Sequence, residues 1–349
     1  MHLRGTIRGT ASGVRVCQGG EPLLYYPLPP YPPPLVQLMY SSPIPSAPAG
    51  LRSGFIALIG RPNVGKSTLM NALVGQKVAI TSPVAQTTRN RLRGILTTDT
   101  AQVIFVDTPG IHKPHHQLGE VLVRNAQAAI AAVDLVLLVV DGSVVAGRGD
   151  QYIVDLLQRN PVPVVLGLNK IDQQPSDRPK VQAISASYQD IADAQGWPSI
   201  EFSALTGAGT EALLECLTQR LEPGPYYYPP DLVTDQPERF IMGELIREQI
   251  LLLTREEVPH SVAVVIDRVE EAPKLTQVLA TVYVERDSQK GIVIGKRGQM
   301  LKQIGSAARL QMQKLIDGPV YLELFVKVQP KWRQSRSQLE DLGYRVEGN

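Results

Sequence analysis

The hydrophobic pattern after residue 50 alternates short apolar runs with longer stretches of helical period. The runs are rich in Val, Ile and Leu and apolar on both faces: "FIALIG", "AQVIFVD", "DLVLLVVD", "PVPVVLGLNK" and "SIEFSA". Strands of this kind are buried between helices, as in a mostly parallel sheet. The stretches between them predict helices at 66–75, 119–132, 148–159 and 209–221. We therefore expect a doubly wound α/β domain over residues 51–222.

A proline-rich break separates this domain from a second, smaller pattern. The segment "LEPGPYYYPPDLVTDQPE" is rich in proline and shows neither helical nor strand periodicity, which predicts a linker over 223–238. The elements expected beyond it are a helix at 239–254, strands at 260–270 and 276–286, two helices around a glycine turn in "GIVIGKRGQMLKQIGSAARLQMQKLI", and a strand in "PVYLELFVKVQ". This order predicts a small α+β domain over 239–349, ending in a basic tail.

The first 50 residues are crowded with proline, as in "YYPLPPYPPPL", and show no period. We expect this extension to be disordered. Its first 20 residues contain Arg4, Arg8 and Arg15 and no acid, but no apolar core typical of a secretory signal. A targeting peptide and a start codon assigned too far upstream are both compatible with this pattern.

Composition narrows the class of protein. A chain of 349 residues with 43% hydrophobic and 19% charged residues is typical of a soluble protein of about two domains, and no apolar run approaches the roughly 18 residues of a membrane span. The two cysteines, Cys17 and Cys216, exclude a disulfide framework and lack metal-ligand spacing. Such sparse cysteine usage fits a reducing compartment.

The net charge of +2 conceals an asymmetry along the chain. From Lys290 to Arg345 there are 11 basic and 4 acidic residues, a balance of +7, which leaves −5 for the rest. A charge distribution of this kind indicates a C-terminal surface for a polyanion.

The stretch "GRPNVGKST" matches the phosphate-loop pattern G-x-x-x-x-G-K-[ST] between an expected strand and helix. The glycines let successive N–H groups turn inward and form an anion-binding nest with the helix N-terminus. Lys66 supplies a positive charge for the β and γ phosphates, and the Ser67 hydroxyl a ligand for Mg²⁺. The predicted phosphate-binding residues are Gly60, Arg61, Pro62, Asn63, Val64, Gly65, Lys66, Ser67 and Thr68.

The strand "VIFVD" ends in "DTPG", a second phosphate-sensing motif. Asp107 can hold Mg²⁺ through water, and the Gly110 N–H can meet a γ phosphate; Thr108 and Pro109 lie between them. In the intervening "SPVAQTTRNR", a threonine hydroxyl could complete the metal shell only when a γ phosphate is present. Thr87 and Thr88 are both candidates, and the sequence does not decide between them.

The tetrapeptide "NKID" indicates that the base is guanine. A carboxylate at Asp172 can accept hydrogen bonds from the N1–H and 2-amino group of guanine, whereas adenine has no donor at either position. Lys170 can lie along the base. The further predicted contacts are Asn169 and the segment Ser203, Ala204 and Leu205, with the Ala204 N–H directed to the guanine O6.

The motifs therefore predict hydrolysis of GTP, in which the protein positions a water and neutralises developing charge. The predicted catalytic groups are Lys66, Gly110 and one threonine of the pair 87/88. In the Ras-like arrangement a glutamine after the "DxxG" glycine orients the water, but this chain has Ile111. Because isoleucine cannot hydrogen-bond to water, we predict slow intrinsic turnover.

The turn "GKRG" places Gly295, Lys296, Arg297 and Gly298 between two expected helices. Glycines at both ends allow close approach of the backbone, and the two cations can contact phosphates of a single strand, as in the GXXG loop of KH domains. Further predicted RNA contacts are Lys302, Lys331 and Arg333. Trp332 either stacks on a base or packs against the last strand. The neighbouring apolar face, expected to be mostly core, comprises Ile292, Ile294, Met300, Leu301 and Ile304.

From about residue 54 to its end the chain resembles the Era family of bacterial GTPases. The resemblance rests on "GRPNVGKST", "AQTTR", "DTPGIHKP", "NKID", "SALTG", "ELIREQILLLTREEVPHS" and "VIGKRGQMLKQIG" in this order. It implies a type II KH domain that binds the 3′ end of small-subunit (16S) ribosomal RNA, a role in 30S subunit assembly, and a GTP-dependent switch. It also implies a cytoplasmic protein with some peripheral contact with the inner membrane. We expect the protein to be a monomer.

Two positions acquire meaning from the resemblance. The family carries an apolar residue where Ile111 stands, and Asn63 resembles the asparagine of GTPases that recruit K⁺ as an extra cation. The extension before residue 54 departs from the family pattern.

An alternative interpretation is a GTPase whose basic domain anchors it to a membrane or protein. A modification enzyme with an accessory GTPase has no supporting metal cluster, nucleophile triad or dinucleotide fingerprint in the sequence.

Overall fold

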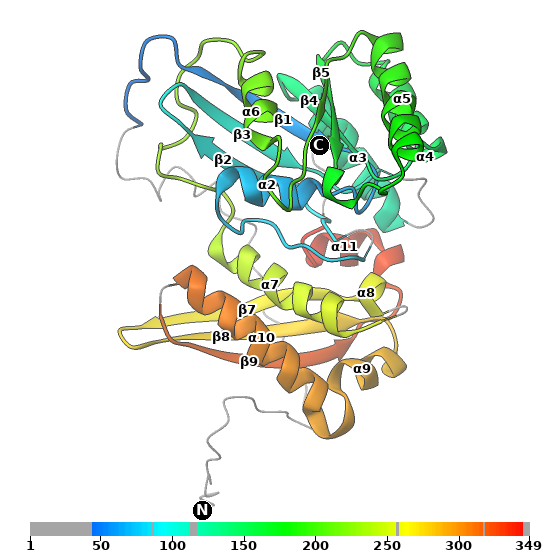
Figure 1. Cartoon of the computed structure of the whole chain (residues 1–349). Helices are drawn as coiled ribbons and strands as arrows, with labels where there is room; N and C mark the ends of the chain where they lie inside the picture. The colour runs from blue at the N-terminus through cyan, green and yellow to red at the C-terminus, as the bar shows by residue number, and fades with distance from the viewer. Residues whose placement is uncertain (1–43, 85–86, 112–116, 256–257, 317, 345–349) are drawn as a thin grey trace, which may run out of the picture. The chain divides into compact units, whose positions relative to one another are not determined.

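The computed structural model describes residues 44–84, 87–111, 117–255, 258–316 and 318–344 (Figure 1). Contacts between residues divide this part of the chain into two compact units. The first comprises residues 44–241 and 331–344, and the second residues 242–330. The sequence pattern placed 331–344 with the second domain instead. Most of the proline-rich extension, 1–43, lies outside the described residues.

The first unit is built on a six-stranded sheet with strand order β2-β3-β1-β4-β5-β6. Five strands run parallel: β1 (Arg52–Ile59), β3 (Ala101–Asp107), β4 (Leu135–Asp141), β5 (Val164–Asn169) and β6 (Ser199–Glu201). The edge strand β2 (Leu92–Thr97), which the hydrophobic pattern did not predict, pairs antiparallel with β3. The predicted doubly wound, mostly parallel fold is confirmed.

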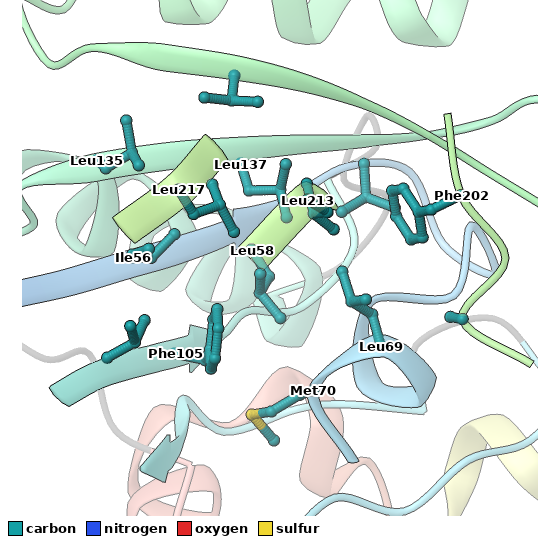
Figure 2. Packing of buried hydrophobic residues seen from close by; sticks show 14 of the residues in the cluster. Ile56, Leu58, Leu69, Met70, Phe105, Leu135, Leu137, Phe202, Leu213 and Leu217 are labelled. Atoms are coloured by element: carbon teal, nitrogen blue, oxygen red, sulfur yellow. The ribbon is translucent and has the colours of Figure 1, made fainter. Parts of the chain in front are cut away.

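Helices cover both faces of this sheet, as the apolar strands require. On one face, α2 (Lys66–Val74) and α6 (Thr210–Thr218) pack over β1 and its neighbours, and Figure 2 shows their side chains meeting those of the strands. On the other face lie α3 (Gln117–Ala131), α4 (Arg148–Leu157) and α5 (Arg178–Gln195). Successive residues of β1 enter opposite cores, and all are fully buried from Ile56 to Ile59. Because these five strands run parallel, their carboxyl ends lie at the same edge of the sheet.

The predicted linker is strapped to the edge of the first unit. Gln102 on β3 accepts hydrogen bonds from the N–H groups of Tyr227 (2.7 Å) and Tyr228 (3.1 Å), and its side-chain amide donates to the Tyr228 carbonyl (2.9 Å). The β2 residue Ile95 donates its N–H to the carbonyl of Val233 (2.8 Å). The strap thus satisfies backbone groups of an edge strand that would otherwise be open to pairing.

The second unit has a three-stranded sheet in the order β7-β8-β9. Strand β8 (Leu275–Val284) pairs antiparallel with β7 (Ala263–Ala272) and parallel with β9 (Val320–Val328). The helices are α7 (Glu238–Leu253), which begins at the end of the first unit, and α8 (Val258–Ser261), α9 (Asp287–Ile294) and α10 (Gln299–Ile316). The element order confirms the predicted α+β domain, with α8 as an addition.

The C-terminal segment is folded. It forms the 3-10 helix η3 (Trp332–Gln334) and the helix α11 (Arg336–Asp341), and contacts group both with the first unit. Trp332, Leu339 and Tyr344 are buried. No helix in the described residues is both long and apolar enough to cross a membrane.

Candidate functional site

The phosphate loop connects β1 to α2, and two of its glycines have no room for a side chain. A Cβ on Gly60 would lie 2.2 Å from the Val139 carbonyl oxygen, and a Cβ on Gly65 would lie 2.2 Å from the Asn169 amide nitrogen. Gly65 also has a φ of 98°, which disfavours other residues. The loop is therefore held against the ends of β4 and β5, with the first turn of α2 directly behind it.

Lys66 lies within the loop and is 6% exposed. Its Nζ donates to the carbonyl oxygens of Gly60 (3.1 Å) and Arg61 (2.9 Å), which places the ammonium group inside the loop. Burial lowers the pKa of Lys66 from its ordinary 10.5 to about 8, although the nearby Asp107 carboxylate opposes the shift. Lys66 is therefore a buried, poorly hydrated cation inside the loop, where it can pair with phosphate groups.

Three side-chain oxygens meet next to this lysine. Ser67 Oγ donates to Asp107 Oδ2 (2.6 Å), Thr88 Oγ1 donates to the same oxygen (3.0 Å), and the two hydroxyls lie 2.9 Å apart. Thr87 instead hydrogen-bonds to the Val84 carbonyl (2.6 Å) and lies 2.8 Å from Ser82 Oγ. The structure thus brings Thr88, and not Thr87, to the predicted metal site. Residues 85–86 of the same motif lie outside the described residues.

The second oxygen of Asp107 indicates what this cluster lacks. Asp107 Oδ1 is buried and has no hydrogen-bond partner among the described residues. Burial raises the pKa of Asp107, while Lys66, the hydroxyls of Ser67 and Thr88, and the Thr108 N–H act in the opposite direction. A divalent cation would satisfy the orphaned carboxylate oxygen, and all-oxygen donors suit Mg²⁺. The residues present therefore fit the ion that the motif implies.

The "DTPG" segment lies directly against the phosphate loop. A Cβ on Gly110 would lie 2.6 Å from the Pro62 nitrogen, and the Thr108 hydroxyl donates to the Leu58 carbonyl (2.8 Å). Ile111 donates its N–H to the Gly60 carbonyl (3.1 Å), and its side chain is 2% exposed within the core. The residue at the Ras-like glutamine position is thus a core residue. The following "HKP" lies outside the described residues.

The predicted base-binding residues converge at the ends of β5 and β6. Asn169 links two loops, because its amide donates to the Val64 carbonyl (2.8 Å) and its Oδ1 accepts the Ala204 N–H (2.9 Å). Asp172 is exposed and accepts a hydrogen bond from Ser203 Oγ (2.5 Å). The Ala204 N–H, predicted to meet the guanine O6, is thus engaged within the protein. Of the "SAL" residues, Leu205 is 72% exposed.

Sequence reasoning missed the residue that holds Lys170. The Lys170 ammonium forms an ion pair with Asp141 at the end of β4 (2.7 Å). Burial pushes the pKa of Asp141 up, but hydrogen bonds from Lys170 and Ser143 outweigh it and leave that pKa below its ordinary value. An acid at the carboxyl end of a parallel strand was a visible signal. The pair fixes the lysine beside the predicted base site.

In the second unit the GXXG loop projects its cations into solvent. Gly295 has a φ of 71°, and a Cβ there would lie 2.6 Å from the Met300 Cβ. Arg297 has left-handed backbone angles, and both Lys296 and Arg297 are exposed. The loop follows α9, whose start is fixed by Gln289 Oε1, which accepts the N–H groups of the two residues before the helix. The turn thus presents two positive charges to solvent.

The other residues predicted to contact RNA or to line the apolar face differ in their exposure. Lys302 on α10 is exposed, as are Lys331 and, at 42%, Ile292, whereas Leu301 and Ile304 are core residues. Trp332 is fully buried against Arg89 and Tyr344, so it does not offer a face for stacking on a base. Lys331 and Arg333, which flank it, belong by their contacts to the first unit.

Each of the two units matches a known protein family. Residues 55–170 match the family model of a 50S ribosome-binding GTPase, and residues 257–333 match that of a KH domain. The chain is 72% identical to GTPase Era of Nostoc sp. over 87% of its own length and 93% of the relative's. It is 67% identical to GTPase Era of Synechocystis sp., covering 87% of this chain and 96% of that relative.

Two solved structures share the fold of the chain. The crystal structure of a single-residue variant of Aquifex aeolicus Era bound to GDP and AlF4⁻ is 36% identical with a TM-score of 0.81, and matches 85% of this chain and all of that one. A structure of Era with MgGDPNP and nucleotides 1506–1542 of 16S ribosomal RNA matches to the same extent, with a TM-score of 0.80. With a phosphate loop, a guanine-type motif, a KH unit and relatives of this identity, the chain belongs to the Era family of GTPases.

Proposed function

We propose that this GTPase binds the 3′ end of small-subunit (16S) ribosomal RNA through its KH unit and acts in assembly of the 30S subunit, with GTP switching the RNA-binding state. The observation that carries the proposal is the GXXG loop, whose glycine at 295 is sterically required and whose Lys296 and Arg297 are exposed. The related Era solved with nucleotides 1506–1542 of 16S ribosomal RNA supports the choice of RNA.

In the proposed mechanism the first unit holds the triphosphate on its phosphate loop, where Lys66 neutralises charge that develops on the phosphates. The Gly110 N–H would face the γ phosphate, and Asp172 would select guanine. Mg²⁺, when bound with the nucleotide, would be held by Ser67, Thr88 and Asp107 and would supply further charge neutralisation. Because Ile111 is a core residue, the chain offers no side chain there to orient water, which favours slow intrinsic turnover.

Potassium is a further proposed cofactor. Asn63 has a left-handed φ of 63°, and its amide nitrogen donates to the Pro83 carbonyl (2.7 Å), which directs the side chain across the loop that carries Thr88. A K⁺ ion bound by the asparagine oxygen would add positive charge in the transition state. Turnover should then be faster in K⁺ than in Na⁺ buffer, and equal rates in the two would remove K⁺ from the mechanism.

The RNA proposal is tested by fluorescence anisotropy with an oligonucleotide of the 16S 3′ end and a scrambled oligonucleotide of equal length. Exchange of Lys296 and Arg297 for Asp should abolish preferential binding and leave GTP affinity intact. A matched control exchanges Arg268 and Lys274 for Asp, both exposed on β7 and the following turn of the same unit. This control changes the net charge equally and should keep the sequence preference.

The outcome separates RNA recognition from an electrostatic anchor. A KH groove prefers one single-stranded sequence, whereas an anchor follows charge alone and should be weakened equally by both double variants. Binding to anionic lipid vesicles that RNA cannot compete away would favour the anchor. We further propose that the protein is a monomer of the cytoplasm with peripheral contact with the inner membrane, which sedimentation and cell fractionation would test.

A further inference from the structure

Arg89 is a buried arginine next to the metal site, and it is held by aromatic rings from the C-terminal segment. Its side chain is 2% exposed. The guanidinium carbon lies over the Trp332 ring, 5.8 Å from its centroid, and over the Tyr344 ring, 5.7 Å from its centroid. The two rings stack with centroids 5.7 Å apart, and Arg89 Nη1 donates to the Tyr344 hydroxyl (3.3 Å). We call these three residues the aromatic clamp.

The clamp is joined by one peptide bond to a predicted metal ligand. Arg89 directly follows Thr88, whose hydroxyl lies 2.9 Å from Ser67 Oγ and donates to Asp107 Oδ2. Cation–π contacts are strongest where water is excluded, as it is around this buried guanidinium. The position of the Thr88 backbone is therefore constrained on one side by the oxygen cluster and on the other by the clamp.

The segment that supplies the rings also contacts the helix that follows the second phosphate-sensing motif in the chain. Helix α3, which begins at Gln117 soon after Gly110, packs against η3. Residues that follow both γ-phosphate motifs thus meet one short C-terminal segment. Only residues 329–331 separate η3 from the last strand of the KH unit, so the segment is covalently joined to the part of the chain proposed to bind RNA.

We propose that Arg89 is a positioning residue for the GTPase reaction, which Trp332 and Tyr344 hold so that the Thr88 hydroxyl is presented to the metal when a γ phosphate is bound. The inference goes beyond the proposed function, because it concerns nucleotide and Mg²⁺ binding and holds whether or not the KH unit binds RNA. It assigns the C-terminal segment to the GTPase site.

The test measures Mg²⁺-dependent affinity for a non-hydrolysable GTP analogue and for GDP. Arg89→Lys keeps the charge but loses the planar group, and Tyr344→Ala removes one ring. Both variants should lower the affinity for the analogue about tenfold or more and leave the affinity for GDP unchanged, because the threonine is a metal ligand only when a γ phosphate is present. Tyr344→Phe keeps the ring and should retain most of the analogue's affinity. Arg336→Ala, an exposed arginine of α11 outside the clamp, is the matched control.

A second readout follows the clamp itself. The chain has two tryptophans, so Trp197→Phe leaves Trp332 as the sole tryptophan reporter. Its emission should change when GDP is replaced by the analogue, and Arg89→Lys should abolish that change. Near-ultraviolet circular dichroism and GDP affinity would verify that each variant is folded. Equal loss of GDP and analogue affinity, or an analogue affinity that none of the clamp variants alters, would overturn the proposal.

Discussion

At the scale of single residues, the backbone marks the functional loops. The non-glycine residues with positive φ among the described residues are Asn63, Lys170, Arg297 and Lys331. Such conformations are strained and persist only where neighbouring structure enforces them. The first three lie in the phosphate loop, the "NKID" motif and the GXXG turn, and the fourth precedes the aromatic clamp. Strain is thus concentrated where side chains must be aimed at a ligand or at a contact.

The lowered pKa of Lys66 predicts how GTP binding depends on pH. Phosphates bind the protonated lysine, so above its pKa of about 8 the affinity for GTP should fall, by up to about tenfold per pH unit. Without nucleotide the sign for stability is opposite: between about 8 and 10.5 the unfolded chain binds more protons, so folding stability gains as pH rises. At about pH 8.5, roughly half a unit above that pKa, GTP binding should be accompanied by proton uptake. Titration calorimetry in buffers of different ionisation enthalpy would detect it.

Lys66→Arg serves as the control for this titration, because arginine stays protonated throughout the range. Its GTP affinity, whatever its absolute value, should show no loss between about pH 7.5 and 9. A dissociation constant of the unsubstituted protein that is flat over this interval would show that the lysine is not the titrating group.

Asp172 predicts base selectivity at the same scale. Asp172→Asn keeps an oxygen that can accept the Ser203 hydroxyl but places a donor where guanine also has donors. Loss of two charge-assisted hydrogen bonds, worth about 1.5–3 kcal/mol each, should weaken GTP binding by at least about a hundredfold and improve binding of xanthosine triphosphate. Competition against a fluorescent guanine nucleotide would measure both. Asp177→Asn, an exposed acid nearby in the chain, should change neither, and unaltered discrimination in D172N would contradict the assigned role.

At the scale of elements, the sequence predicted best where one period dominates. The strands apolar on both faces and the glycine loops at their ends were predicted because each pattern is local. Strand β2 was missed, since "LRGILT" is short and follows a polar loop. Helix α5 was missed because only Ile184, Tyr188 and Ala192 along it are buried, a stripe too narrow to stand out in an otherwise polar stretch.

The site follows the same division between local and long-range information. The motifs placed the phosphate loop, Asp107 and "NKID", because these depend on residues near one another in the sequence. The choice of Thr88 over Thr87, the ion pair of Lys170 with Asp141 and the aromatic clamp depend on contacts between distant segments. No sequence period encodes these contacts. Of the residues involved, only Asp141 carried a local signal, as an acid at the carboxyl end of a strand, and nothing in the sequence named Lys170 as its partner.

The strap over the sheet edge predicts a stability effect. Gln102 is fully buried, and its side chain satisfies two N–H groups and one carbonyl of residues 227–228. Gln102→Ala leaves these backbone groups without their partners and should lower the free energy of unfolding of the first unit by about 2–3 kcal/mol. Urea denaturation followed by tryptophan fluorescence would measure it. Gln219→Ala, at an exposed glutamine that directly follows α6, should have almost no effect, and a similar change in both variants would remove the strap's special role.

At the scale of the whole molecule, the two units have separate sheets and separate cores. Each unit should therefore unfold in its own transition, and each transition should respond to its own ligand. Both tryptophans lie in the first unit, so fluorescence follows that unit, while far-ultraviolet circular dichroism follows both. This difference between probes makes the two transitions separable in one protein.

A GTP analogue with Mg²⁺ should raise the melting temperature of the fluorescence-detected transition, by roughly 5–10 °C at about one hundred times its dissociation constant. The 16S 3′-end oligonucleotide should raise the other transition, which only circular dichroism detects, because it stabilises the fold that carries the GXXG loop. In the variant with Asp at 296 and 297 the first shift should persist and the second should vanish. If either ligand instead moved both transitions equally, the units would unfold as one, and GTP and RNA would act on a single cooperative structure. Separate shifts would show that each ligand stabilises its own unit, and the segments that join the units, of which the stretch from β9 to the aromatic clamp is one, would then be the route to test for communication between the sites.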